Sequence, residues 1–328
     1  MKKQRRRIYA ALLCSSMVFS LVSTPVSAAE TGQLTNPPTS TEGPGSPESA
    51  SGNEAAAVLN GLYAALPVTN GVKEVATAEE LTAALADSSI SIITLKDDVE
   101  ISSTLTVNRT VTLDLNGHVL KYESANNGSV IVVEGSGQLT IEDSNTSNLS
   151  HKFMPNGKLW VLDEASGTET VTGGVITGGT GTDISTFGGT TWYCGGGALI
   201  KNGGSLTMRG GNIIGCSAEC GGGVCIDSER NGEPGQFSMS GGSIIGCVAS
   251  NSGGGVFASG KFQMSDKAVI RSCTVESTIQ LICGGGVYVN GSSSFEMSDT
   301  AKIEGCQAIS TSAYGGGVYV SSSSSFVM

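Results

Sequence analysis

Short stretches in which apolar and polar residues alternate recur along the C-terminal half of the chain. Within one repeat they are Val-x-Val at residues 287–289, Phe-x-Met at 295–297, and an isoleucine three residues before a cysteine at 303–306. A period of two places the first and third residues of a stretch on one face of a strand and the middle residue on the other. The pattern therefore predicts three short strands in every repeat.

A glycine triplet opens each repeat. The triplets begin 26, 32, 31 and 31 residues apart, at Gly195, Gly221, Gly253, Gly284 and Gly315. Self-similarity at such a period is typical of one unit stacked on copies of itself. We predict an all-β fold, a parallel β-helix solenoid. Each repeat forms one triangular coil, its apolar residues point into the bore, and the triplet makes a corner that needs positive φ and close backbone approach.

The N-terminal part shows the same character with less regular repetition. Strand signals occur at residues 90–95, 105–107, 111–115, 130–133 and 139–141. Before them, Thr77-Ala-Glu-Glu80 has the sequence of a capping box that opens a short amphipathic helix. Because the first coil of a solenoid exposes an edge, we expect residues 77–86 to form an N-terminal cap.

The chain divides into four predicted segments. Residues 1–28 combine five basic residues, an apolar run and small residues at the end, which is the pattern of a secretory signal peptide. Residues 29–71 are rich in Thr, Ser, Pro and Gly and predict a linker with a possible short helix at 53–66. Residues 72–190 hold the cap and irregular coils, and residues 191–328 hold the regular repeats. Because the sequence stops within a Phe-x-Met stretch, we expect a fragment of a longer protein.

The charge balance excludes some classes of partner. The formal charge is −11, and it becomes −16 when the five basic residues of the signal peptide are removed. Such a chain repels nucleic acid and anionic membranes. Nothing after the signal peptide is long and apolar enough to span a bilayer. We expect a monomer that is secreted or held at the cell surface, with no cofactor.

The repeats and the lead-in to them resemble a known family. Residues 111–120, Val-Thr-Leu-Asp-Leu-Asn-Gly-His-Val-Leu, together with the Gly-Gly-Gly-Val-Tyr-Val, Phe-x-Met and Ile-x-Gly-Cys motifs, are similar to right-handed parallel β-helix proteins of the pectate-lyase-like superfamily. Within it, the chain resembles adhesin-like cell-surface proteins of bacteria over about residues 72–328. The same fold hosts lyases, hydrolases and adhesins, so the resemblance implies the fold more strongly than an activity. Family members often place Asn where this chain repeats Cys.

Candidate catalytic residues are sparse. Pectate-lyase chemistry needs clustered carboxylates for Ca²⁺ and a basic group that takes a proton. The chain has no Arg-x-Pro-x-x-Arg arrangement and no Gly-His-Gly. Asp97, Asp98 and His118 are expected at turns and on the surface, and His118 and His151 are too few for a histidine-based metal site. Whether the protein is an enzyme stays open, with the balance toward a non-catalytic role.

Two aspartates align between neighbouring repeats. Asp266 and Asp299 both follow Met-Ser, so they are expected on adjacent coils. Two close carboxylates can bind Ca²⁺. The alternative is a turn in which Ser-Asp bonds to the local backbone, and we favour this second interpretation.

Cysteines form two ladders after the signal peptide. One ladder, at a bore-facing corner, contains Cys216, Cys247, Cys273 and Cys306. The other immediately precedes the triplets and contains Cys194, Cys220, Ser252 and Cys283. Export and an even count permit disulfides. Equivalent side chains in a ladder point the same way, however, so we favour free thiols that act as small buried hydrophobes.

Two further ladders are expected to face outward. On the Val-x-Val strands the middle residues Phe257, Tyr288 and Tyr319 form a strip of rings that can contact sugars or a partner protein; packing along the ladder is the alternative. On the isoleucine strands Ile214 and Ile245 are followed by Arg271 and Glu304, which suits a surface ion pair.

These observations favour a non-catalytic exported surface or adhesion scaffold. Its expected partners are glycans or host and cell-surface proteins, contacted through the strip of rings. A polysaccharide lyase or glycoside hydrolase on the same fold is the first alternative. A structural spacer that presents a further C-terminal domain is the second.

Overall fold

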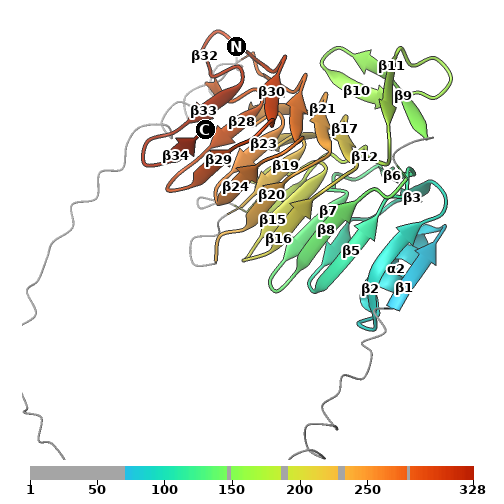
Figure 1. Ribbon diagram of the computed structural model, residues 1–328. Helices are drawn as coiled ribbons and strands as arrows, with labels where there is room; N and C mark the ends of the chain where they lie inside the picture. Colours follow the sequence, from blue (N-terminus) through green and yellow to red (C-terminus); the bar gives the residue numbers. More distant parts are fainter. Residues whose placement is uncertain (1–70, 146–148, 186–190, 228–232, 279–280) are drawn as a thin grey trace, which may run out of the picture. The chain divides into compact units, whose positions relative to one another are not determined.

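The computed structural model describes residues 71–145, 149–185, 191–227, 233–278 and 281–328. The predicted signal peptide lies outside the described residues, as does the predicted linker except for Gly71. The described part is a parallel β-helix in which strands from successive coils pair in long sheets (Figure 1). The predicted fold class is confirmed.

Sheet A is the longest wall of the solenoid. It carries the Phe-x-Met stretches, and its strands are, in order of pairing, β1 (Gly71–Val75), β2 (Ile90–Leu95), β5 (Thr110–Asp114), β8 (Gln138–Glu142), β16 (Ser205–Met208), β20 (Gln236–Met239), β24 (Lys261–Met264), β29 (Ser294–Met297) and β34 (Ser325–Val327).

Sheets B and C complete the bore. Sheet B carries the isoleucine stretches, in β3 (Val99–Ile101), β6 (Val119–Tyr122), β12 (Val175–Thr177), β17 (Asn212–Ile214), β21 (Ser243–Ile245), β25 (Val269–Arg271) and β30 (Lys302–Glu304). Sheet C carries the Val-x-Val stretches, in β4 (Leu105–Val107), β7 (Ile131–Glu134), β15 (Ala198–Lys201), β19 (Val224–Ile226), β23 (Val256–Ala258), β28 (Val287–Val289) and β33 (Val318–Val320).

The prediction of three strands per repeat is wrong for the regular coils. Between sheets B and C the described residues add sheet E, with β13 (Thr182–Ser185), β14 (Thr191–Cys194), β18 (Ser217–Cys220), β22 (Val248–Ser252), β26 (Thr274–Glu276), β27 (Ile282–Cys283), β31 (Gln307–Ile309) and β32 (Ala313–Tyr314). The residues between the bore cysteine and the next triplet pair with their equivalents and bury Ala249, Val275 and Ile282 in a separate small cluster.

The bore is filled by one hydrophobic core that runs the length of the described solenoid. Phenylalanines of sheet A stack in it, with ring centroids 5.1 Å apart for Phe237 and Phe262 and 4.6 Å for Phe262 and Phe295. Interplanar angles of 6° and 8° make these offset stacks of parallel rings, which add to the energy of area burial. The register aligns identical residues, so the repeat in sequence becomes a ladder in space.

The glycine triplets form tight corners, as predicted. Gly221 has φ of 64°, a left-handed conformation that favours glycine. At Gly222 a Cβ atom would lie 2.5 Å from the carbonyl oxygen of Gly254 on the next coil. Positive φ and close approach are therefore separate requirements, met by successive residues of one triplet.

Helix α2 (Ala78–Ala86) closes the N-terminal end of the bore. Thr77 is its N-cap, and its hydroxyl accepts from the Glu80 amide at 3.2 Å. The Glu80 carboxylate reaches back to the amide of Ala76, 2.8 Å away, one residue earlier than the capping box predicts. Leu81 and Ala84 are buried in the main core, so the helix covers the first coil.

An antiparallel insertion interrupts the solenoid. Its strands, β9 (Ser150–Asn156), β10 (Leu159–Leu162) and β11 (Glu169–Thr172), pair as β10-β9-β11. The insertion packs Phe153 and Trp160 against the outer face of sheet B. No expectation from the sequence included it.

Candidate functional site

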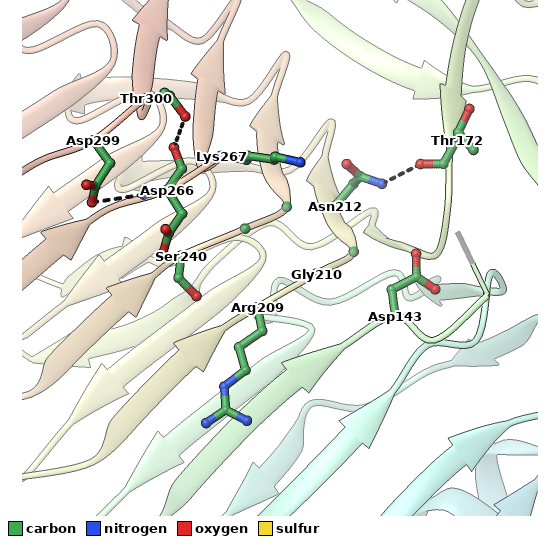
Figure 2. A pocket seen from close by; sticks show the side chains of 13 residues that line it. Asp143, Thr172, Arg209, Gly210, Asn212, Ser240, Asp266, Lys267, Asp299 and Thr300 are labelled. Atoms are coloured by element: carbon green, nitrogen blue, oxygen red, sulfur yellow. Dashed lines mark hydrogen bonds between the residues drawn. The ribbon is translucent and has the colours of Figure 1, made fainter. Parts of the chain in front are cut away.

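A polar groove lies where sheet A turns into sheet B. It has a volume of about 510 Å³, and glycines at positions 210, 211, 241 and 242 contribute to its lining. Figure 2 shows side chains from several successive coils around it. The polar groove is lined by Asp143, Arg209, Asn212, Asp266, Lys267 and Asp299, among others.

The structure brings Asp266 and Asp299 together at one end of the polar groove. Both have left-handed backbone conformations, with φ of 50° and 59°. The Asp299 carboxylate accepts from the Asp266 amide at 3.4 Å and from the hydroxyl of Ser298 at 2.8 Å. These contacts are those of stacked turns. Calcium binding by the pair stays a prediction, and no group of three or more His, Cys, Asp or Glu side chains within the described residues is placed to hold a metal ion.

Asp143 forms another wall of the groove and was not singled out from the sequence. Its two carboxylate oxygens accept from the amides of Gly117 at 2.7 Å and Gly174 at 2.8 Å. Burial raises the pKa of this carboxyl above its usual value, opposed by the two amide bonds, and the nearby Asp114 carboxylate raises it further. In the sequence, Asp143 is marked only as an acidic residue that follows a strand. Such residues are too common for this signal to identify a site.

The histidines lie close to these turns. His118 Nδ1 is 3.5 Å from an oxygen of Asp98, whose side chain is largely exposed. His151, in the insertion, is buried, with Nε2 at 2.8 Å from the carbonyl oxygen of Gly117 and Nδ1 at 2.9 Å from Glu164. The His151 ring thus ties the insertion to the solenoid.

The predicted strip of rings is present, but part of its ladder is covered. Phe257, Tyr288 and Tyr319 are in register, with centroids 5.3 and 5.6 Å apart along the ladder. Each is half-buried. The same ladder positions at Leu199 and Cys225 are fully buried, because Ile184 and Trp192 of the β13–β14 hairpin pack over them.

The ladder on the isoleucine strands of sheet B, which was also expected to face outward, is partly buried. Ile214 and Ile245 are buried beneath the insertion, in a cluster with Trp160. Arg271 lies over the Trp160 ring, with its guanidinium carbon 5.2 Å from the centroid. Arg271 and Glu304 are in register, yet no ion pair joins them within the described residues. The prediction of an ion pair between Arg271 and Glu304 is therefore wrong. The Arg271 guanidinium lies against the Trp160 ring of the insertion instead.

The cysteine ladders both form. Cys216, Cys247 and Cys273 are fully buried in the main core, and Cys306 packs against it. Cys194 pairs in register with Cys220, then Ser252 and Cys283 follow. The eight cysteines of the described residues are free thiols in the structure.

The comparison with sequence families agrees with this architecture. Residues 72–165 match a sequence family described as a pectate lyase-like adhesive domain. No curated protein and no solved structure gives a significant match. The family match and the stacked parallel sheets together fit a parallel β-helix repeat protein. Within the described residues, no helix has the length and apolar character needed to cross a membrane.

Proposed function

We propose that the protein is an exported, non-catalytic adhesion scaffold that acts outside the cell or at its surface. The match of residues 72–165 to an adhesive domain supports this role. The stacked coils support it too, because they give a long, rigid wall on which the same position recurs at each coil.

The contact surface we propose is the strip of Phe257, Tyr288 and Tyr319. The single observation that carries it is the register of three rings on one half-buried wall. The Tyr288 and Tyr319 rings are stacked at an interplanar angle of 17°, so their faces largely meet each other. The strip therefore offers ring edges and polar tips, such as the Tyr288 hydroxyl bonded to Asn290 at 3.1 Å. Such a surface suits a glycan or a surface protein.

The test is a double substitution, Tyr288→Leu with Tyr319→Leu. Leucine is compatible with the ladder, since Leu199 occupies the equivalent position. We expect loss of binding in a glycan array and a cell-binding assay, with an unchanged circular dichroism spectrum. The matched control is Gln263→Ser with Glu296→Ser, an exposed cross-coil pair on sheet A, which should bind as the wild type does.

Three other outcomes would overturn parts of the proposal. Unchanged binding by the leucine variant would exclude the strip as the contact surface. Turnover of a polyuronate with Ca²⁺ would favour a lyase or hydrolase. A wild-type protein that binds no glycan and no cell would favour the structural spacer.

A further inference from the structure

The floor of the polar groove is glycine backbone that the stacking of the coils requires. Two successive coils turn from sheet A into sheet B through the pairs Gly210-Gly211 and Gly241-Gly242. A Cβ atom on Gly241 would lie 2.2 Å from the carbonyl oxygen of Arg209, and one on Gly242 would lie 2.3 Å from that of Gly211. The neighbouring coils therefore keep larger residues out of these positions, and the corner is hollow there.

Larger turns close the groove at both ends. The turns that follow β24 and β29 are longer than the glycine turns and carry Asp266, Lys267 and Asp299. At the other end lie Asp143, after β8, and Thr172 of the insertion (Figure 2). The groove thus runs past β8, β16, β20, β24 and β29, which are neighbours in sheet A. At a strand spacing of about 4.8 Å, the four steps between them give a length of about 19 Å.

The charged groups around the groove do not neutralise one another. Lys267 is exposed, and its side chain extends toward Asn212 (Figure 2). In the part of the chain that the structure describes, the Lys267 ammonium group makes no ion pair with Asp143, Asp266 or any other carboxylate. Asp143 accepts two amide hydrogen bonds, and its oxygens can accept further ones. Hydrogen-bond donors and acceptors thus line the groove with bonding capacity left over.

This combination of groups suits a neutral ligand rich in hydroxyl groups. A hydroxyl both donates and accepts, so a row of hydroxyls satisfies carboxylates and an ammonium group in one site. An anionic ligand would meet the like charges of Asp143, Asp266 and Asp299. An apolar ligand would desolvate these charges without pairing them. A metal ion finds no group of three or more ligating side chains among the described residues.

We propose that the polar groove binds a short neutral oligosaccharide. Asp143 and Asp266 accept hydrogen bonds from sugar hydroxyls, and Lys267 and Ser240 donate to them. The volume of about 510 Å³ is in the range of ligand sites, and the extended shape suits a chain of sugars rather than a single one. The site goes beyond the proposed contact surface, because the groove lies at the corner of sheets A and B whereas the strip of rings lies on sheet C.

The experiment measures the affinity of the full chain for short cello-, xylo-, manno- and galacto-oligosaccharides by isothermal titration calorimetry, with oligogalacturonate as the charged counterpart. We expect at least one neutral oligosaccharide to bind with an affinity that added salt does not change, since salt screens interactions between charges. Lys267→Met removes the ammonium group from an exposed side chain and should weaken binding by about tenfold or more. The matched control is Lys261→Met, an exposed lysine on β24 of the same coil, which should bind as the wild type does.

A second pair of variants tests the hollow itself. Ser240→Leu places an apolar side chain in the groove and should abolish binding, whereas Ser238→Leu, on β20 of the same coil and outside the groove, should not. Circular dichroism of each variant checks the fold.

Several results would overturn the proposal. They are no binding of any neutral oligosaccharide by the wild type, binding of oligogalacturonate alone, and equal losses in Lys267→Met and Lys261→Met. Binding that is lost in the Tyr288→Leu, Tyr319→Leu variant but kept in the groove variants would assign the sugar to the strip instead. Failure of the groove therefore leaves adhesion through the strip to be judged by its own test.

Discussion

At the scale of single residues, Asp143 joins two turns on the wall of the polar groove. Its carboxylate holds the amides of Gly117 and Gly174, and it is the side chain that a Cβ on Gly173 would strike, at 2.3 Å. The site is partly desolvated, and Asp114 lies near enough to repel a second negative charge. Asp143 therefore holds the two turns in place, although burial and the Asp114 carboxylate disfavour its charged form.

The raised pKa of Asp143 makes the stability of the protein depend on pH. Burial raises the folded-state pKa of Asp143 above its unfolded value, so the folded protein binds this proton more tightly. Its stabilising contribution is present below the unfolded pKa and is lost as the pH rises through the folded pKa. We expect the free energy of unfolding of the wild type, relative to Asp143→Asn, to increase as the pH falls from about 7 to about 4. Urea denaturation at several pH values measures this, and a relative stability that instead falls on acidification would contradict it.

At the scale of elements, the capping helix is fixed by a side chain from elsewhere. The helix has no basic residue in its last turn. Arg109, between β4 and β5, donates to the carbonyls of Ala84 and Leu85 at 2.8 Å each and to that of Ile90 at 2.6 Å. One guanidinium thus satisfies carbonyls that the end of α2 leaves without partners.

We predict that Arg109→Ala destabilises the protein by about 2–4 kcal/mol, because several partly buried carbonyls lose a charged donor. Arg209→Ala is the matched control. Arg209 makes a single ion pair with Glu142, and both side chains are substantially exposed, so its loss should cost about 0–1 kcal/mol. Chemical denaturation of both variants provides the comparison. Equal effects would show that Arg109 does not hold the cap.

At the scale of the whole molecule, the solenoid is stabilised by contacts between neighbouring coils. The core phenylalanines show this most directly, because Phe262 stacks on Phe237 on one side and on Phe295 on the other. In such an arrangement the energy of a coil depends mainly on its immediate neighbours. Loss of one ring should therefore weaken the structure locally.

We expect Phe262→Ala to cost about 3–5 kcal/mol by leaving a cavity in the bore. Hydrogen exchange should show faster exchange in β20, β24 and β29, while β2, β5 and β8 keep their protection. Uniform loss of protection across all these strands would show instead that the described solenoid unfolds as one cooperative unit.

The sequence by itself determined the solenoid and its registers. Period-two alternation and the glycine triplets place Val287 in the bore and Tyr288 outside it, and identical residues at a fixed period can stack in only a few ways. The helix at 77–86 could also be predicted from the sequence, because an N-cap and an apolar face are local signals. Cys194 and Cys220 could be aligned in the same manner.

Only the tertiary structure decided what covers the coils. The strand pattern predicts that the Ile214 side chain points away from the bore, yet Trp160 of the insertion covers it. Cys225, the middle residue of its strand, is also expected to face outward, but it is buried in a cluster against which Ile184 and Trp192 of the β13–β14 hairpin pack. Asp143 acquires its role from turns at Gly117 and Gly174. The alternation along a strand determines on which face of the sheet a side chain lies. What packs on that face depends on residues distant in the chain, and their contacts leave no periodic pattern in the local sequence.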